Sequence, residues 1–228
     1  MEGLRRLLAF DFALKAGAWN LEAALALEPG EIVVLTGPTG SGKTSLLRGL
    51  AGQIRPQKGQ IRAGALELFD HFRGIDLPPW RRPLALCVQG DALFPHLSVA
   101  GNLRFGLNQR TAWATRVEPW VEAFGLGDLL HHLPRQLSGG QRQKVQLART
   151  LALETPVLLL DEPFGALDPE SHAAVRAALR QHIRTEGRCA LVVSHTPGDA
   201  VALGAFEAKL RNGWLSLAQP SLEAGSCL

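Results

Sequence analysis

The sequence has few cysteines and no long apolar run, and these absences exclude several classes of protein. Its three cysteines, Cys87, Cys189 and Cys227, are an odd number at wide spacing, which fits neither a disulfide framework nor a zinc site. A reducing cytosol is therefore the expected compartment. No apolar run approaches the roughly 20 residues that cross a bilayer, and Asp11 and Lys15 interrupt the stretch where a signal peptide needs an apolar core. We expect neither a signal peptide nor a membrane-spanning helix.

The chain also lacks a strong charge of either sign. Its 24 Lys and Arg are scattered among 21 Asp and Glu, for a formal net charge of +3. This balance predicts a solvated mixed-charge surface and no nucleic-acid partner. The 46% hydrophobic content of the 228 residues can bury one sizeable core. We therefore expect one domain over residues 1–220, followed by a C-terminal tail at 221–228.

Apolar segments of buried-strand length alternate with helical segments, which predicts an α/β fold around a largely parallel sheet. The expected buried strands are EIVVLT, PLALCVQ, PVLLLD and CALVVSH. Before them, alternating apolar residues at 10–14 and 21–27 predict an antiparallel hairpin at the edge of the sheet. Helical spacing at 113–125 and 140–153 predicts an inserted helical lobe over about 91–154.

The clearest chemical motif is GPTGSGKT, at residues 37–44, which fits the pattern G-x-x-x-x-G-K-[ST]. A strand, EIVVL, precedes it and a helix, TSLLRGLAG, follows it. Backbone N–H groups and the helix N-terminus then converge on phosphates, Lys43 adds a positive charge, and Thr44 can ligate Mg²⁺. The alternative is a chance match in a chain with 24 glycines, and the strand and helix on either side disfavour it.

Polar side chains follow other buried strands, at the edge where open α/β sheets bind their ligands. Asp161 and Glu162 end the segment VLLLDE, and Gln89 and His195 end two further strands. One carboxylate can hold Mg²⁺ or its waters, and its neighbour can orient the attacking water. Each signal is weak alone, since an acidic pair after a strand is more often a loop start or a cap. The remaining histidines suggest no metal cluster, and we expect them to be surface or core residues: His71, His96, His131, His132, His172 and His182.

Taken together, the motifs make the chain resemble the ATP-binding subunits of ABC transporters over about residues 7–217. The motifs follow the family's order: GPTGSGKT, CVQ, LSGGQ, VLLLDEP, GALD and SH. The resemblance implies a P-loop NTPase core with a parallel sheet, an N-terminal antiparallel β hairpin and an inserted helical lobe. It also implies ATP and Mg²⁺ as cofactors, and hydrolysis of ATP to ADP and phosphate coupled to transmembrane transport.

The resemblance assigns a role to each matching residue. Glu162 corresponds to the catalytic glutamate and His195 to the switch histidine, with Gln89 and Lys43 also in the catalytic set. Thr44, Gln89 and Asp161 are the implied metal ligands. The implied nucleotide-binding residues are Gly37, Pro38, Thr39, Gly40, Ser41, Gly42, Lys43, Thr44, Ser45, Ser138, Gly139, Gly140, Gln141, Asp161 and Asp168.

The stretch LSGGQ, at 137–141, contains no acid or base. Its Ser138 offers a hydroxyl, its two glycines let backbone N–H groups approach an anion, and the helix that follows favours negative charge at its N-terminus. The resemblance implies a head-to-tail dimer, in which the LSGGQ of one copy closes over the γ-phosphate bound by the other. A helix N-cap at Ser138 is compatible with this role.

The chain departs from the resemblance at two places. It has no tyrosine, whereas many relatives stack a hairpin tyrosine on adenine, so Phe12 and Trp19 are the candidates for base stacking. Gly165 stands where the family commonly has serine.

The resemblance further implies membrane permease subunits as partners, indirectly a solute-binding protein, and a peripheral place on the cytoplasmic face of the inner membrane. Residues 93–97, LFPHL, are expected to form part of the permease groove, with Phe94 as its anchor. IRPQKGQI and DALFPHLSVAGNLRFG are similar to molybdate-type importers, which favours an oxyanion, while LSGGQRQKVQLAR is also similar to thiamine-type importers. A soluble ABC ATPase acting on nucleic acid and a nucleotide-regulated switch are disfavoured alternatives.

Overall fold

The computed structural model describes residues 6–16, 19–90, 92–107 and 113–217. These residues build an 11-stranded sheet with the strand order β6-β5-β4-β1-β2-β11-β10-β3-β9-β8-β7. Its strands are β1 (Leu8–Ala16), β2 (Trp19–Leu27), β3 (Ile32–Thr36), β4 (Lys58–Ala63), β5 (Leu66–Asp70), β6 (Ile75–Asp76), β7 (Leu84–Cys87), β8 (Val157–Asp161), β9 (Cys189–Val193), β10 (Phe206–Arg211) and β11 (Trp214–Leu217).

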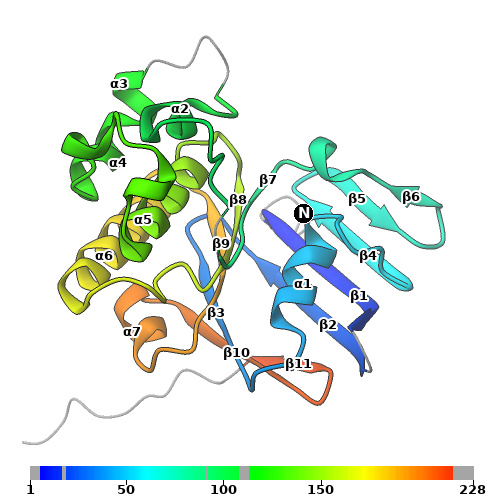
Figure 1. Cartoon of the computed structure of the whole chain (residues 1–228). Coiled ribbons are helices and arrows are strands. Elements are labelled where there is room, and N and C mark those ends of the chain that lie inside the picture. The colour runs from blue at the N-terminus through cyan, green and yellow to red at the C-terminus, as the bar shows by residue number, and fades with distance from the viewer. Residues whose placement is uncertain (1–5, 17–18, 91, 108–112, 218–228) are drawn as a thin grey trace, which may run out of the picture.

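Helices lie beside this sheet, and most of them gather at its β7 end (Figure 1). The α-helices are α1 (Lys43–Leu50), α2 (Val99–Arg104), α3 (Trp113–Arg116), α4 (Glu118–Ala123), α5 (Gly139–Leu151), α6 (Pro169–Thr185) and α7 (Asp199–Leu203). Short 3-10 helices are η2 (Pro79–Arg81), η3 (Gly127–Leu129) and η4 (Pro134–Gln136). Within the described residues, no helix has both the length and the apolar character that a membrane span requires.

The predicted buried strands are confirmed. β3, β9, β8 and β7 pair in parallel, and β10 pairs in parallel with the other side of β3. All five residues of β8 and of β9 are buried, because helices or other strands cover both faces of this part of the sheet. This burial explains why the two segments are apolar throughout instead of alternating with polar residues.

The antiparallel hairpin is confirmed, but its predicted place at the sheet edge is wrong. β1 and β2 pair from Leu8 opposite Leu27 onward. β1 also pairs with β4, and β2 contacts β11 through Trp214 opposite Glu22, so the hairpin lies inside the sheet. The sequence of β4, KGQIRA, is mostly polar and largely exposed, and therefore gave no strand signal.

Two apolar clusters hold the strands and helices together. One cluster packs the helices α2, α4, α5 and α6 on one face of the parallel strands. The other packs α1 and the β1–β2 hairpin on the opposite face. The described chain between β7 and β8 contains helices and no strand, and its treatment as an inserted lobe at about 91–154 stays a prediction.

Candidate nucleotide site

The glycine-rich loop connects the end of β3 to the start of α1, as its sequence predicts. Gly37 has a φ of 148°, and a Cβ atom there would lie only 2.3 Å from the carbonyl oxygen of Leu210. Gly42, the residue before α1, has a φ of 100° in the left-handed region that favours glycine. The loop therefore depends on glycine at both of its ends, and α1 begins directly at Lys43.

Lys43, the first residue of α1, turns its side chain back toward this loop. Its Nζ donates hydrogen bonds to the carbonyl oxygens of Gly37 and Pro38, each at 2.9 Å, and the residue is 6% exposed. Burial lowers the pKa of the ammonium, while the charges of Glu162 and Asp161 act in the opposite direction. An incoming phosphate would supply this cation with a charged acceptor in place of neutral carbonyls.

Asp161 ends β8 as a buried carboxylate, at 3% exposure. Its Oδ1 atom has no hydrogen-bond partner among the described residues, and burial raises its pKa, against a hydrogen bond with the Thr44 side chain. A buried acceptor without a donor fits an oxygen-seeking cation such as Mg²⁺, which binds one or two carboxylates and substrate phosphates. The described residues contain no group of three or more His, Cys, Asp and Glu that could hold a metal ion by themselves.

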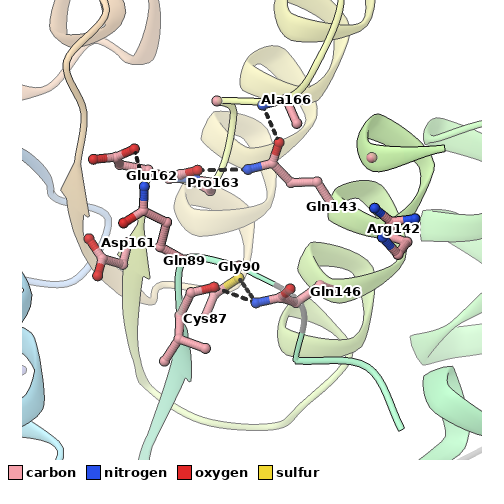
Figure 2. A pocket seen from close by; sticks show the side chains of 13 residues that line it. Cys87, Gln89, Gly90, Arg142, Gln143, Gln146, Asp161, Glu162, Pro163 and Ala166 are labelled. Atoms are coloured by element: carbon pink, nitrogen blue, oxygen red, sulfur yellow. Dashed lines mark hydrogen bonds between the residues drawn. The ribbon is translucent and has the colours of Figure 1, made fainter. Parts of the chain in front are cut away.

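Glu162 stands between two side chains that come from other strand ends, of which Figure 2 shows Gln89. Its Oε2 accepts a hydrogen bond from Gln89 Nε2 at 2.8 Å, and its Oε1 lies 3.1 Å from His195 Nε2. Glu162 has a φ of 49°, in the left-handed region that non-glycine residues rarely adopt. Its backbone N–H donates to the oxygen of Val193 at 3.0 Å. The structure thus brings together the polar residues that follow β7, β8 and β9.

A cavity of about 360 Å³ lies beside Glu162 and is bordered by α5. Two α5 residues that sequence reasoning missed form hydrogen bonds here, as Figure 2 shows. Gln143 donates to the carbonyl oxygen of Glu162, and Gln146 donates to that of Val88. Their spacing of three residues, which places both on one helix face, was the available signal.

LSGGQ forms the start of α5. Ser138 is the N-cap, its Oγ accepts from Gln141 N at 3.2 Å, and Gln141 Oε1 accepts from Ser138 N at 2.8 Å. This reciprocal capping box satisfies the first turn of the helix and leaves Ser138 and Gly139 exposed. Asp168 has a comparable place, because it caps α6 by accepting from Ser171 N at 2.9 Å. A hydrogen bond with the Ser171 side chain, followed by this one from the Ser171 backbone, lowers the pKa of Asp168.

The prediction of base stacking by Phe12 is wrong. Phe12 is 2% exposed, because the alternation of β1 points its ring inward. The ring packs on α1, where a Cβ atom at Gly49 would lie 3.3 Å from it. A buried ring offers no free face to adenine. The side chain of the other candidate, Trp19, lies outside the described residues.

The fold and the loop define a P-loop nucleotide-binding protein, and comparison with known proteins identifies the family. The family model described as ABC transporter matches residues 22–165, and the chain belongs to this family.

The chain is 38% identical, over 94% of its length and 59% of the relative's, to the molybdenum import ATP-binding protein ModC of Paramagnetospirillum magneticum. It is 40% identical, over 82% of its length and 79% of the relative's, to the thiamine import ATP-binding protein ThiQ of Aliivibrio fischeri. The chain spans about half the length of most of the curated relatives that it matches.

The chain is also similar to solved structures of ATP-binding cassettes. One is an ATP-binding subunit of an ABC transporter, with a TM-score of 0.80 and 26% identity over 94% of this chain and 90% of the other. The second is a dimeric ATP-binding cassette in a post-hydrolysis state bound to ADP and Pi, with a TM-score of 0.74 and 25% identity over 91% of this chain and 96% of the other.

Proposed function

We propose that the chain binds and hydrolyses ATP to power a membrane ABC importer. The observation that carries this proposal is the place of Glu162, whose carboxylate meets Gln89 and His195 beside the buried Asp161. A nucleotide switch would need the phosphate loop but not a carboxylate held in this way. The arrangement therefore favours an enzyme over a switch.

Each residue then has a defined part in hydrolysis. Lys43 and the backbone of residues 37–44 bind the phosphates. Thr44, Asp161 and Gln89 would hold Mg²⁺, which would neutralise developing charge on the phosphates. Glu162 accepts a hydrogen bond from the attacking water and orients it toward the γ-phosphate, while His195 stands where it can donate a hydrogen bond to that phosphate.

We further propose that two copies dock head to tail and share their ATP sites. The exposed Ser138 and Gly139 at the start of α5 support this, because they offer a hydroxyl and N–H groups to an anion outside their own chain. The similar dimeric cassette bound to ADP and Pi is a second support. Asp168 would lie close to the shared site as part of the turn before α6.

The proposed partners are permease subunits, which place the dimer on the cytoplasmic face of the inner membrane, and indirectly a solute-binding protein. The solute we propose is an oxyanion such as molybdate, in line with the relative from Paramagnetospirillum magneticum. Thiamine is the second candidate, because the relative from Aliivibrio fischeri is a thiamine import protein of similar identity.

The test uses the purified chain, alone and co-expressed with a candidate permease. Phosphate release from MgATP that stops on chelation of Mg²⁺ supports the proposal, and Lys43→Ala should reduce it to background. A chain that binds no ATP contradicts the proposal. If molybdate but not thiamine stimulates ATP hydrolysis by the permease complex, the result supports an oxyanion as the transported solute. The reverse result supports thiamine as the solute.

A further inference from the structure

One side chain of α5 bridges the turn that carries Glu162. The Nε2 atom of Gln143 donates to the carbonyl oxygen of Glu162 at 2.7 Å, and its Oε1 atom accepts from Ala166 N at 2.6 Å (Figure 2). A single planar amide therefore contacts both ends of the segment 162–166. The same Glu162 oxygen also accepts from Gly165 N at 3.3 Å, inside the turn.

This segment needs such support because Glu162 has a left-handed backbone, with a φ of 49°. A non-glycine residue stays in that conformation only when its surroundings hold it there. The backbone angles of Glu162 decide where its carboxylate points, and so whether Gln89 and His195 can reach it. Gln143 bonds to the main-chain oxygen of Glu162, so its effect on the Glu162 carboxylate is indirect.

The same face of α5 meets the site at two further places. One turn before Gln143, a Cβ atom at Gly140 would lie 2.8 Å from the carbonyl oxygen of Ala166, so the helix lies directly on the turn. One turn after it, Gln146 donates to the oxygen of Val88 at 2.5 Å, next to Gln89. The helix that begins with LSGGQ therefore touches both the segment that carries Glu162 and the strand end that carries its amide donor.

We propose that Gln143 is a positioning residue, which ties the orientation of the Glu162 carboxylate to the position of α5. This inference rests on the proposed function. When the N-terminus of α5 meets the ATP bound by a second copy, a shift of the helix reaches Glu162 of its own chain through the Gln143 amide. Occupancy of one ATP site thereby adjusts the catalytic carboxylate of the other.

The test separates the two hydrogen bonds of the amide. Gln143→Met removes both, and Gln143→Glu keeps the acceptor for Ala166 N while it loses the donor to Glu162. Gln181→Met, at an exposed position on α6, is the matched control. We expect kcat for ATP hydrolysis to fall at least about tenfold in Gln143→Met, because small misplacements of catalytic groups are costly. The kcat of Gln143→Glu should also fall below the parent value, and the kcat of the Gln181→Met control should equal the parent value.

The Michaelis constant for ATP should stay within about twofold of the parent value in all three variants, since binding contacts common to ground and transition states are unchanged. A merely structural role would instead lower the thermal unfolding midpoint and leave the kcat per folded molecule unchanged.

A double-mutant cycle decides whether Gln143 acts through Glu162. In a Glu162→Gln background, Gln143→Met should cause no further loss of hydrolysis. An additive loss, or a parent-like kcat in Gln143→Met and Gln143→Glu, overturns the inference and leaves the proposed function intact. A parent chain that hydrolyses no ATP overturns both.

Discussion

Gln89 Nε2 lies 2.8 Å from Glu162 Oε2, although 73 positions of sequence separate the two residues. The contact exists because β7 and β8 are parallel neighbours, so both strands deliver their last polar side chain to the same edge. On the other side of β8, β9 delivers His195 in the same way. The sheet topology thus assembles the site from three strand ends.

Glu162→Gln should keep ATP binding and remove most hydrolysis. The amide occupies the same space and can still meet Gln89, but it cannot accept a proton from water. Loss of a general base of this kind costs about 10²–10⁴-fold in rate. Nucleotide binding and phosphate release measured on the same preparation check this, with Glu122→Gln, at an exposed position of α4, as control. Parent-like turnover by Glu162→Gln would show that another group activates the water.

Phe94→Ala should weaken permease association. The ring centroids of Phe94 and Phe105 lie 4.1 Å apart, and Phe105 is 53% exposed. The pair forms a partly exposed aromatic surface, and aromatic anchors often dominate interfaces, so removal of one should weaken binding about tenfold or more. A pull-down with the permease measures this, and Phe72→Ala, at an 87% exposed position, is the control.

Phe94 could also stabilise the fold, because its ring lies under the Arg149 guanidinium, at 5.1 Å from the ring centroid. A role in the fold and a role in permease binding predict different results. If Phe94 only supports the fold, Phe94→Ala should lower the thermal unfolding midpoint and leave association of the folded fraction unchanged. Nucleotide affinity of the isolated subunit should stay at the parent value in either case.

His182→Phe should reduce the loss of stability in acid. Burial, followed by the charge of Arg188, lowers the pKa of His182 from 6.5 to about 4, and its ring packs edge-on to Trp120 at 4.7 Å. Glu186 acts in the opposite direction and Arg116 adds to the lowering. Because the folded pKa is the lower one, the unfolded chain binds the proton more readily, and stability declines as the pH falls from about 6.5 to 4.

Over that pH range, the shifted pKa of His182 should lower the free energy of unfolding by on the order of 1–3 kcal/mol. Chemical unfolding of parent and His182→Phe at several pH values measures it as a difference, which cancels the titration of shared carboxylates. Equal declines in the two proteins would contradict the role given to His182.

The sequence predicted the buried apolar strands and the phosphate-binding loop. In these segments, which include EIVVLT and PVLLLD, the local sequence pattern favours the same structure as the packed fold. β4 was missed because its residues are polar and its pairing with β1 comes from tertiary contact. Phe12 was misassigned because a strand's alternation tells which residues share a face, and only the packed fold tells which face is buried.

Within the site, the polar residues at the strand ends could be predicted from the sequence. The α5 residues that form hydrogen bonds to the main chain beside them could not. Gln89, Glu162 and His195 each follow an apolar run, so topology alone brings them to one edge. Gln143 and Gln146 sit in a helix with many polar residues, and their spacing of three shows only that they share a face, not that this face turns toward Glu162. Their contacts depend on how α5 packs beside β7 and β8.

In the proposed dimer, each ATP site joins the phosphate loop of one copy to LSGGQ of the other. Lys43→Ala should damage the site in its own chain, and Ser138→Arg should damage the site of the partner, so neither pure variant forms an intact site. A mixed dimer contains one intact site, built from the loop of the Ser138→Arg chain and the LSGGQ of the Lys43→Ala chain.

ATP hydrolysis by an equimolar mixture of the two variants tests whether the sites are shared in this way. The dimer is followed in parallel by light scattering in a Glu162→Gln background, which slows turnover and shows whether mixed dimers form on ATP. If the sites are shared, the mixture recovers part of the parent hydrolysis, while each variant alone stays near background. Normal ATP-dependent dimerisation and hydrolysis by Ser138→Arg alone would contradict this sharing and leave residues 137–141 with only their role as a helix cap.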